Sequence, residues 1–146
     1  MSELYAVTSG DPAGIGPDIS LKIALREDSH QFVVFGNMDL LRERSEMHAM
    51  DIKFIEFDEA TSDSQIQKNT LLVKNFNLNQ SIQPGVMDSK NGSYTLSMID
   101  DAVKGCMDGR FTGCITGPVN KESIAKSGYE FSGHTEYIGK LCNQTP

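Results

Sequence analysis

The chain has 146 residues, which is enough for a hydrophobic core, and we expect residues 1–146 to form one domain. Thirteen lysines and arginines stand against twenty aspartates and glutamates, so the net charge is −7. A chain this acidic has no general affinity for nucleic acid, and any anionic ligand must be held locally by backbone amides or a few placed cations.

In the first half of the chain, short apolar runs alternate with segments of helical pattern. We expect strands at Leu4–Thr8, Phe32–Phe35 and Ile52–Phe57, and helices at Pro17–Arg26 and Met38–Met50. Continuous apolar runs of this kind are typical of strands buried on both faces. The alternation therefore predicts an α/β fold with a largely parallel sheet flanked by helices.

The second half begins less regularly. Asp58–Asn69 is polar and predicts a loop, Thr70–Phe76 predicts a strand, and Asn77–Lys90 predicts an irregular segment. Tyr94–Gly109 then carries apolar residues at helical spacing, and we interpret its tyrosine and methionines as core residues. A short strand at Cys114–Thr116 follows.

Three segments after the predicted strands are candidates for a binding site. The first is the turn GDPAGIGP at 10–17, which follows a strand and opens a helix. Ligands of α/β proteins bind at such positions, outside the carboxyl ends of the strands. The spacing of its glycines is not that of a dinucleotide-binding or Walker motif, so a tight turn that needs glycine is an equal alternative.

The second segment, Gly117–Lys121, also joins a strand to a predicted helix, Lys121–Lys126. Free amides at the helix start, together with the Lys121 ammonium, can attract a phosphate or carboxylate. The plainer alternative, which spacing alone favours, is a lysine that faces solvent.

The third segment is Gly133–Glu136, before a predicted helix at Thr135–Leu141. The imidazole of His134 and the hydroxyl of Thr135 are both able to hydrogen-bond a phosphate or a hydroxyl group. His134 with Glu136 supplies at most two ligands, so we predict no metal site in this chain. His30 and His48 belong to no motif.

The remaining signals concern compartment and redox state. Cys106, Cys114 and Cys142 form no Cys-x-x-Cys pair, and we interpret them as buried, reduced cysteines. The N-terminus lacks the pattern of a signal peptide, and no apolar run reaches the roughly 18 residues of a membrane span. We therefore expect a soluble, cytoplasmic protein with no membrane partner.

Together these segments resemble one family. SGDPAGIGPDI near the start, ITGPVNK at 115–121 and AKSGYEFSGHTEY at 125–137 are similar to the signatures of the 4-hydroxythreonine-4-phosphate dehydrogenases of pyridoxal phosphate biosynthesis. The order and spacing agree as well, as does Asn91-Gly92 before the long helix. The resemblance covers the whole chain.

The resemblance implies a two-lobed α/β fold like that of isocitrate and isopropylmalate dehydrogenases, active as a homodimer. It implies an oxidoreductase that uses NAD to oxidise a secondary alcohol of 4-phosphohydroxy-L-threonine, after which the β-keto acid loses carbon dioxide. It also implies a divalent metal (Zn, Mg or Co) that polarises the alcohol oxygen.

By the same resemblance, His134 and Thr135 contact the small phosphorylated substrate, and Asn120 and Lys121 belong to a supporting loop. Gly14 and Gly16 shape the first turn. No residue of this chain is expected to be catalytic in the chemical step, and none is assigned to NAD.

Members of the family are roughly twice as long as this chain. Their three metal-binding histidines and most of their NAD site lie in segments beyond residue 146, so we expect this chain to be a truncated form, about the first half of the fold and inactive alone. Two alternatives remain: a dehydrogenase of D-threonate or D-erythronate 4-phosphate from the same family, and a non-catalytic fragment that only binds or dimerises.

Overall fold

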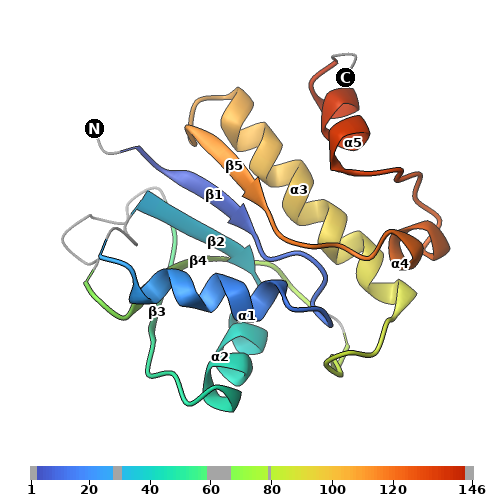
Figure 1. Cartoon of the computed structure of the whole chain (residues 1–146). Helices are drawn as coiled ribbons and strands as arrows, with labels where there is room; N and C mark the ends of the chain where they lie inside the picture. Colours follow the sequence, from blue (N-terminus) through green and yellow to red (C-terminus); the bar gives the residue numbers. More distant parts are fainter. Residues whose placement is uncertain (1–2, 28–30, 59–66, 79, 144–146) are drawn as a thin grey trace.

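The computed structural model describes residues 3–27, 31–58, 67–78 and 80–143. Their strands form one parallel sheet in the order β3-β4-β2-β1-β5 (Figure 1). The strands are β1 (Tyr5–Thr8), β2 (Phe32–Gly36), β3 (Lys53–Glu56), β4 (Thr70–Asn75) and β5 (Gly113–Thr116). The predicted parallel sheet is thus confirmed, and each predicted strand overlaps an observed one.

Helices cover both faces of the sheet. The helical elements are α1 (Gly16–Leu21), η1 (Lys22–Leu25), α2 (Met38–Met47), η4 (Ser89–Asn91), α3 (Gly92–Met107), α4 (Lys121–Lys126) and α5 (His134–Leu141). In Figure 1, α1 and α2 lie on one side of the sheet and α3 on the other. No helix in the described ranges is both long and apolar enough to cross a lipid bilayer.

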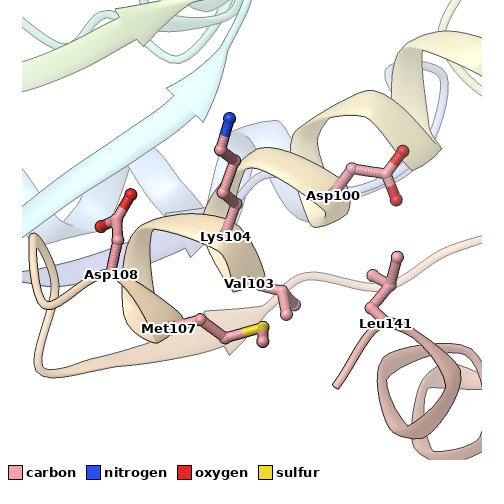
Figure 2. A pocket seen from close by; sticks show the side chains of 6 residues that line it. All are labelled: Asp100, Val103, Lys104, Met107, Asp108 and Leu141. Atoms are coloured by element: carbon pink, nitrogen blue, oxygen red, sulfur yellow. The ribbon is translucent and has the colours of Figure 1, made fainter. Parts of the chain in front are cut away.

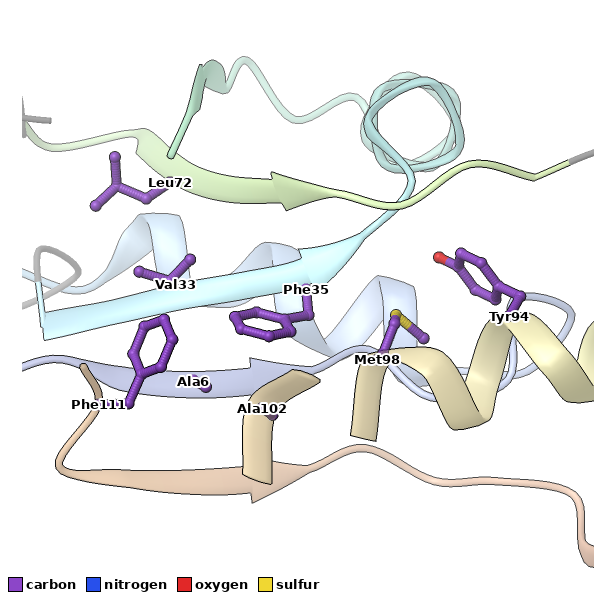
Figure 3. Packing of buried hydrophobic residues seen from close by; sticks show 8 residues of the cluster. All are labelled: Ala6, Val33, Phe35, Leu72, Tyr94, Met98, Ala102 and Phe111. Carbon is purple, nitrogen blue, oxygen red and sulfur yellow. The ribbon is translucent and has the colours of Figure 1, made fainter. Parts of the chain in front are cut away.

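Alternation along the strands divides the core into two layers. On the α3 face, Ala6 and Phe35 pack with Met98 and Ala102 of that helix, and Phe111 meets the Phe35 ring edge-on at 5.5 Å between ring centroids (Figure 3). On the other face, the next residues along the strands, Val7 and Val34, pack with residues of α1 and α2.

Tyr94 connects this core to the start of α2. Its buried hydroxyl accepts a hydrogen bond of 2.8 Å from the backbone amide of Asn37, and burial raises the pKa of Tyr94 to about 12. The interpretation of Tyr94 as a core residue is therefore confirmed, and its phenol serves as a neutral structural hydrogen-bond partner.

A third cluster attaches the C-terminal helices to the outer side of α3. Ile99 and Val103 of α3 pack with Ile124 of α4 and with Phe131, and residues of α5 join at the edge. This cluster places α4 and α5 beside α3 rather than on the sheet itself (Figure 1).

Some expectations from the sequence were wrong. The first predicted helix is present and continues as a 3-10 helix from Lys22. Its Ile19 and Leu25, expected on the apolar side, are instead 51% and 53% exposed, because only one side of this short element meets the sheet. Met107 is 61% exposed and is not a core residue, because it faces the hollow beside α5, whereas its neighbour Cys106 packs on the sheet side of α3. The three cysteines are free, but they are half-buried rather than buried.

Most of the predicted loop at 58–69 and His30 lie outside the described residues.

The chain order explains where a site can form. After β1 the chain runs through α1, on one face of the sheet, and enters β2, which lies on one side of β1. Before β5 the chain runs through α3, on the opposite face, and β5 lies on the other side of β1. The connections after β1 and β5 therefore diverge, and parallel α/β sheets bind ligands at such a switch point.

Candidate functional site

A cavity of about 350 Å³ lies at this switch point, beyond the carboxyl ends of β1 and β5. Three separate segments enclose it, and its lining residues are Asp11, Ala13, Gly14, Ile15, Gly85, Met87, Pro118, Val119 and Asn120. Backbone hydrogen bonds hold these segments together: Asp11 donates to Pro118 at 3.0 Å, and Gly85 donates to Ala13 at 2.8 Å.

Close backbone packing fixes the first of these segments. Gly10 has φ +79°, and a Cβ at that position would lie 2.1 Å from the carbonyl oxygen of Pro118. A Cβ on Gly16 would lie 1.9 Å from the carbonyl oxygen of Ser9. Gly16 therefore shapes the turn as expected, whereas a Cβ on Gly14 would meet only ordinary contacts, at 3.5 Å or more. The glycine that sequence reasoning missed is Gly10.

Asp11 brings a carboxylate to the cavity and is only 7% exposed. Burial raises the pKa of Asp11, although the hydrogen bond of 2.8 Å from the Ala13 amide and the charge of Arg44 act in the opposite direction. The sequence analysis did not select this residue. Its position three residues after the end of a buried parallel strand was the signal that pointed to it.

Asn120 lines the same cavity but has a structural task. Its side-chain oxygen accepts a hydrogen bond of 2.8 Å from the Ser123 amide, so Asn120 is the N-cap of α4. The expectation of a supporting role for Asn120 is consistent with this geometry. Lys121 follows directly as the first residue of α4.

His134 lies near Lys121, at the start of α5. Its ring meets the Phe131 ring edge-on at 5.7 Å between centroids, and its buried Nε2 atom has no hydrogen-bond partner among the described residues. Burial lowers the pKa of His134, and the neighbouring charge of Lys121 lowers it further. The imidazole is therefore neutral near pH 7 and can donate or accept a hydrogen bond.

Gly133 leaves room for charged groups beside this histidine. The position that a Cβ on Gly133 would occupy is 3.7 Å from Lys121 Nζ and 3.2 Å from Glu136 Oε2. Thr135, in contrast, is exposed on the first turn of α5. The structure thus brings Lys121 and His134 together, with Thr135 next to them at the surface.

A different hollow, of about 320 Å³, lies between α3 and α5. Figure 2 shows Val103 and Met107 of α3 facing Leu141 of α5, with Asp100, Lys104 and Asp108 around them. None of the residues predicted to bind ligand lines it, and its floor is apolar. We do not assign a site there.

The described part of the chain contains no group of three or more His, Cys, Asp or Glu side chains arranged to hold a metal ion. The residues present here therefore do not fit a metal site.

The sequence analysis also missed a partly buried network behind the first turn. Arg44 of α2 pairs with Asp18 at 2.7 Å, and Asp18 in turn contacts His48 Nε2 at 2.7 Å. His48, which belongs to no sequence motif, therefore has a partner in the fold. Its partner lies 30 residues earlier in the chain, and no local pattern connects the two.

Comparison with known proteins gives a consistent result. Residues 28–146 match the family described as "Pyridoxal phosphate biosynthetic protein PdxA". Two curated relatives are both called 4-hydroxythreonine-4-phosphate dehydrogenase. The one from Vibrio vulnificus is 36% identical over 143 residues, and the one from Vibrio cholerae is 37% identical over 145 residues.

These alignments cover 98% and 99% of this chain but 44% of each relative, so the chain spans less than half the length of these relatives. A crystal structure of 4-hydroxythreonine-4-phosphate dehydrogenase from Klebsiella pneumoniae has a TM-score of 0.88 and 29% identity to this chain. That match covers 99% of this chain and 46% of the crystallised one. The expected fold, about half of the family's structure, is confirmed.

Proposed function

This chain belongs to the PdxA family, and from that membership we propose that it forms the phosphate-binding side of an NAD-dependent 4-hydroxythreonine-4-phosphate dehydrogenase. The substrate in this proposal is 4-phosphohydroxy-L-threonine. Its secondary alcohol is oxidised, and the β-keto acid then loses carbon dioxide. Relatives that carry this name are 36% and 37% identical to the chain.

The observation that supports the proposal is the Nε2 of His134, which lies beside Lys121 and has no hydrogen-bond partner in the described part of the chain. A buried polar atom without a partner is costly, and one ligand oxygen would satisfy it. The ammonium of Lys121 adds a positive charge to a chain whose net charge is −7. A phosphate provides both the charge and the acceptor oxygens that these two side chains require.

We assign three roles to this chain's own residues. His134 donates a hydrogen bond to a substrate oxygen, Thr135 donates a second from its hydroxyl, and Lys121 neutralises part of the phosphate charge. Asn120 holds Lys121 in place by capping α4. These residues bind and orient the substrate, and none of them takes part in hydride transfer.

NAD would accept the hydride, and the proposal includes a divalent metal in the complete enzyme. We assign no residue of this chain to NAD. None is assigned to the metal either, because the described residues do not fit a metal site. The complete enzyme is proposed to be a cytoplasmic homodimer. We further propose that the 146-residue chain alone does not turn over.

The experiment measures NADH formation by the native gene product with 4-phosphohydroxy-L-threonine and, in parallel, with D-threonate and D-erythronate 4-phosphates. His134→Ala is expected to lower kcat/KM by about 10- to 100-fold, as loss of a hydrogen bond to a charged group implies. Lys121→Met is expected to act in the same direction.

Lys126→Met is the matched control, since Lys126 lies on the same helix but is exposed and paired with Glu122. Unchanged kcat/KM in the His134 variant would remove this residue from the site. Turnover only with a threonate or erythronate phosphate would replace the proposed substrate. NADH formation by the 146-residue chain alone would contradict its proposed inactivity.

A further inference from the structure

The turn at 11–16 forms one wall of the cavity, and a single buried side chain behind it donates hydrogen bonds to two of its backbone carbonyls. Arg44 of α2 is 2% exposed. Its guanidinium donates to the carbonyl of Pro12 at 2.6 Å and to that of Gly14 at 3.1 Å. Both carbonyls belong to the turn, and Gly14 also lines the cavity.

Asp18 completes the charge balance of this guanidinium. One carboxylate oxygen accepts from Arg44 at 2.7 Å, and the other contacts His48 Nε2 at 2.7 Å. Although burial opposes it, the hydrogen bonds from His48 and Arg44 hold the pKa of Asp18 below its usual range. Asp18 is therefore ionised near pH 7, and α1 is tied to α2 through Arg44 and His48.

The forked shape of the guanidinium allows Arg44 to bind several acceptors at once. Three acceptors from two segments converge on the two terminal nitrogens of Arg44, a geometry that a lysine ammonium does not reproduce. On the inner side of the turn, the Ala13 and Gly14 amides donate to Asp11, at 2.8 and 3.0 Å respectively. The turn is thus held from behind by Arg44 and from within by Asp11, and its remaining side lines the cavity.

We propose that Arg44, supported by Asp18 and His48, is a positioning residue that keeps the Asp11–Gly16 turn in the shape that forms the cavity wall. Arg44 lines no part of the cavity, so it acts only through the turn. Its effect on the reaction rests on the proposed function, whereas its effect on the turn does not.

Amide hydrogen exchange of the 146-residue chain tests the structural part directly. In Arg44→Met, the amides of Ala13 and Gly14 are expected to exchange at least about tenfold faster, because the turn loses its anchor. The amides of Ile99 and Val103 in α3 report on global opening and are expected to change little. Arg42→Met is the matched control: Arg42 lies on the same helix, is exposed, pairs with Asp39 at the surface and lies over the Phe54 ring at 5.8 Å from its centroid.

If Arg44→Met does not fold, Arg44→Lys takes its place, because it keeps the charge while losing the fork. Exchange at Ala13 and Gly14 equal to that of Arg42→Met, or faster by the same factor as in α3, would overturn the proposal. A selective increase at the turn supports it.

Kinetics of the native protein test the second part. With the turn loosened, Arg44→Lys is expected to raise KM for the phosphorylated substrate about fivefold or more while kcat changes little. An unchanged KM in a variant whose turn exchanges faster would show that the turn does not shape the binding site. Absence of dehydrogenase activity in the wild type would end the proposed function but leave the exchange result intact.

Discussion

The turn at 10–16 and the segment from Lys121 to His134 carry the two groups of candidate site residues, yet they satisfy their polar groups differently. In the turn, the amides of Ala13 and Gly14 and the carbonyls of Pro12 and Gly14 all have internal partners. Around His134, a buried nitrogen has no partner among the described residues and a lysine lies close by. The first arrangement is that of a rigid wall, and the second is that of a surface completed by a ligand.

This difference suits the two segments to different roles: the turn gives the site its shape, and the segment around His134 can bind a ligand. A segment with satisfied polar groups gains little from an added ligand, so its contribution is shape. A segment with an unsatisfied nitrogen gains from any oxygen that reaches it. Mutations in the turn should therefore affect stability most, and mutations near His134 should affect binding and protonation most.

The largest expected effect comes from Gly10→Ala in the turn. The new Cβ would lie 2.1 Å from the Pro118 carbonyl oxygen, at a φ of +79°. We expect a loss of about 3 kcal/mol or more in the free energy of unfolding, since both strain and a backbone clash are introduced. Urea denaturation of the purified chain measures it.

Gly109→Ala is the control for this prediction. Gly109 has a φ of +86°, but no atom of the described residues lies within 4 Å of its would-be Cβ, so only the backbone strain of about 1 kcal/mol is expected. Equal losses of unfolding free energy in the two variants would show that the turn is not tightly packed against Pro118. The description of the turn as a rigid wall, in contrast to the segment around His134, would then be wrong.

A smaller effect is expected from Asn120→Ala, which removes the N-cap of α4 next to Lys121. The expected loss is about 1 kcal/mol in unfolding free energy. Asn120→Ser keeps an oxygen that can cap the helix and should recover most of it. If Asn120→Ala leaves the free energy of unfolding unchanged but weakens substrate binding, Asn120 acts in ligand binding and not as a stabilising helix cap.

The strands and helices could be predicted from the sequence more completely than the site. The apolar runs at 32–35 and 70–76 could be recognised as strands, because a strand buried on both faces needs continuous apolar residues. The Arg44–Asp18–His48 network was not predictable, since its members are 26 and 30 residues apart in the chain and each looks like an ordinary surface charge.

Within the site, family resemblance selected His134, and residue chemistry made Lys121 a candidate for binding an anion. The sequence did not indicate that the two side chains lie together. Their proximity depends on how the non-helical segment between α4 and α5 packs through Phe131, which no periodic pattern encodes. Asp11 was missed for a similar reason: its burial follows from the closing of three separate segments over the end of the sheet.

The smallest expected effect is a pH dependence that originates at His134. Burial, and then the charge of Lys121, lower the pKa of this histidine in the folded chain. Between about pH 6.5, the pKa of an unfolded histidine, and the lower folded value, the unfolded chain binds a proton that the folded chain does not. Stability should therefore fall as the pH falls through this range, and His134→Gln should remove that part of the slope in urea denaturation.

Lys121→Met gives the sharper form of the same test, because it leaves the histidine in place. Without the neighbouring cation the pKa of His134 should rise toward its ordinary value, which an NMR titration of the imidazole resonances measures directly. Lys126→Met, on the exposed side of α4, should leave the titration unchanged. If Lys121→Met also leaves it unchanged, the lysine and the histidine do not share one electrostatic environment. A single phosphate would then have no reason to bridge the two side chains.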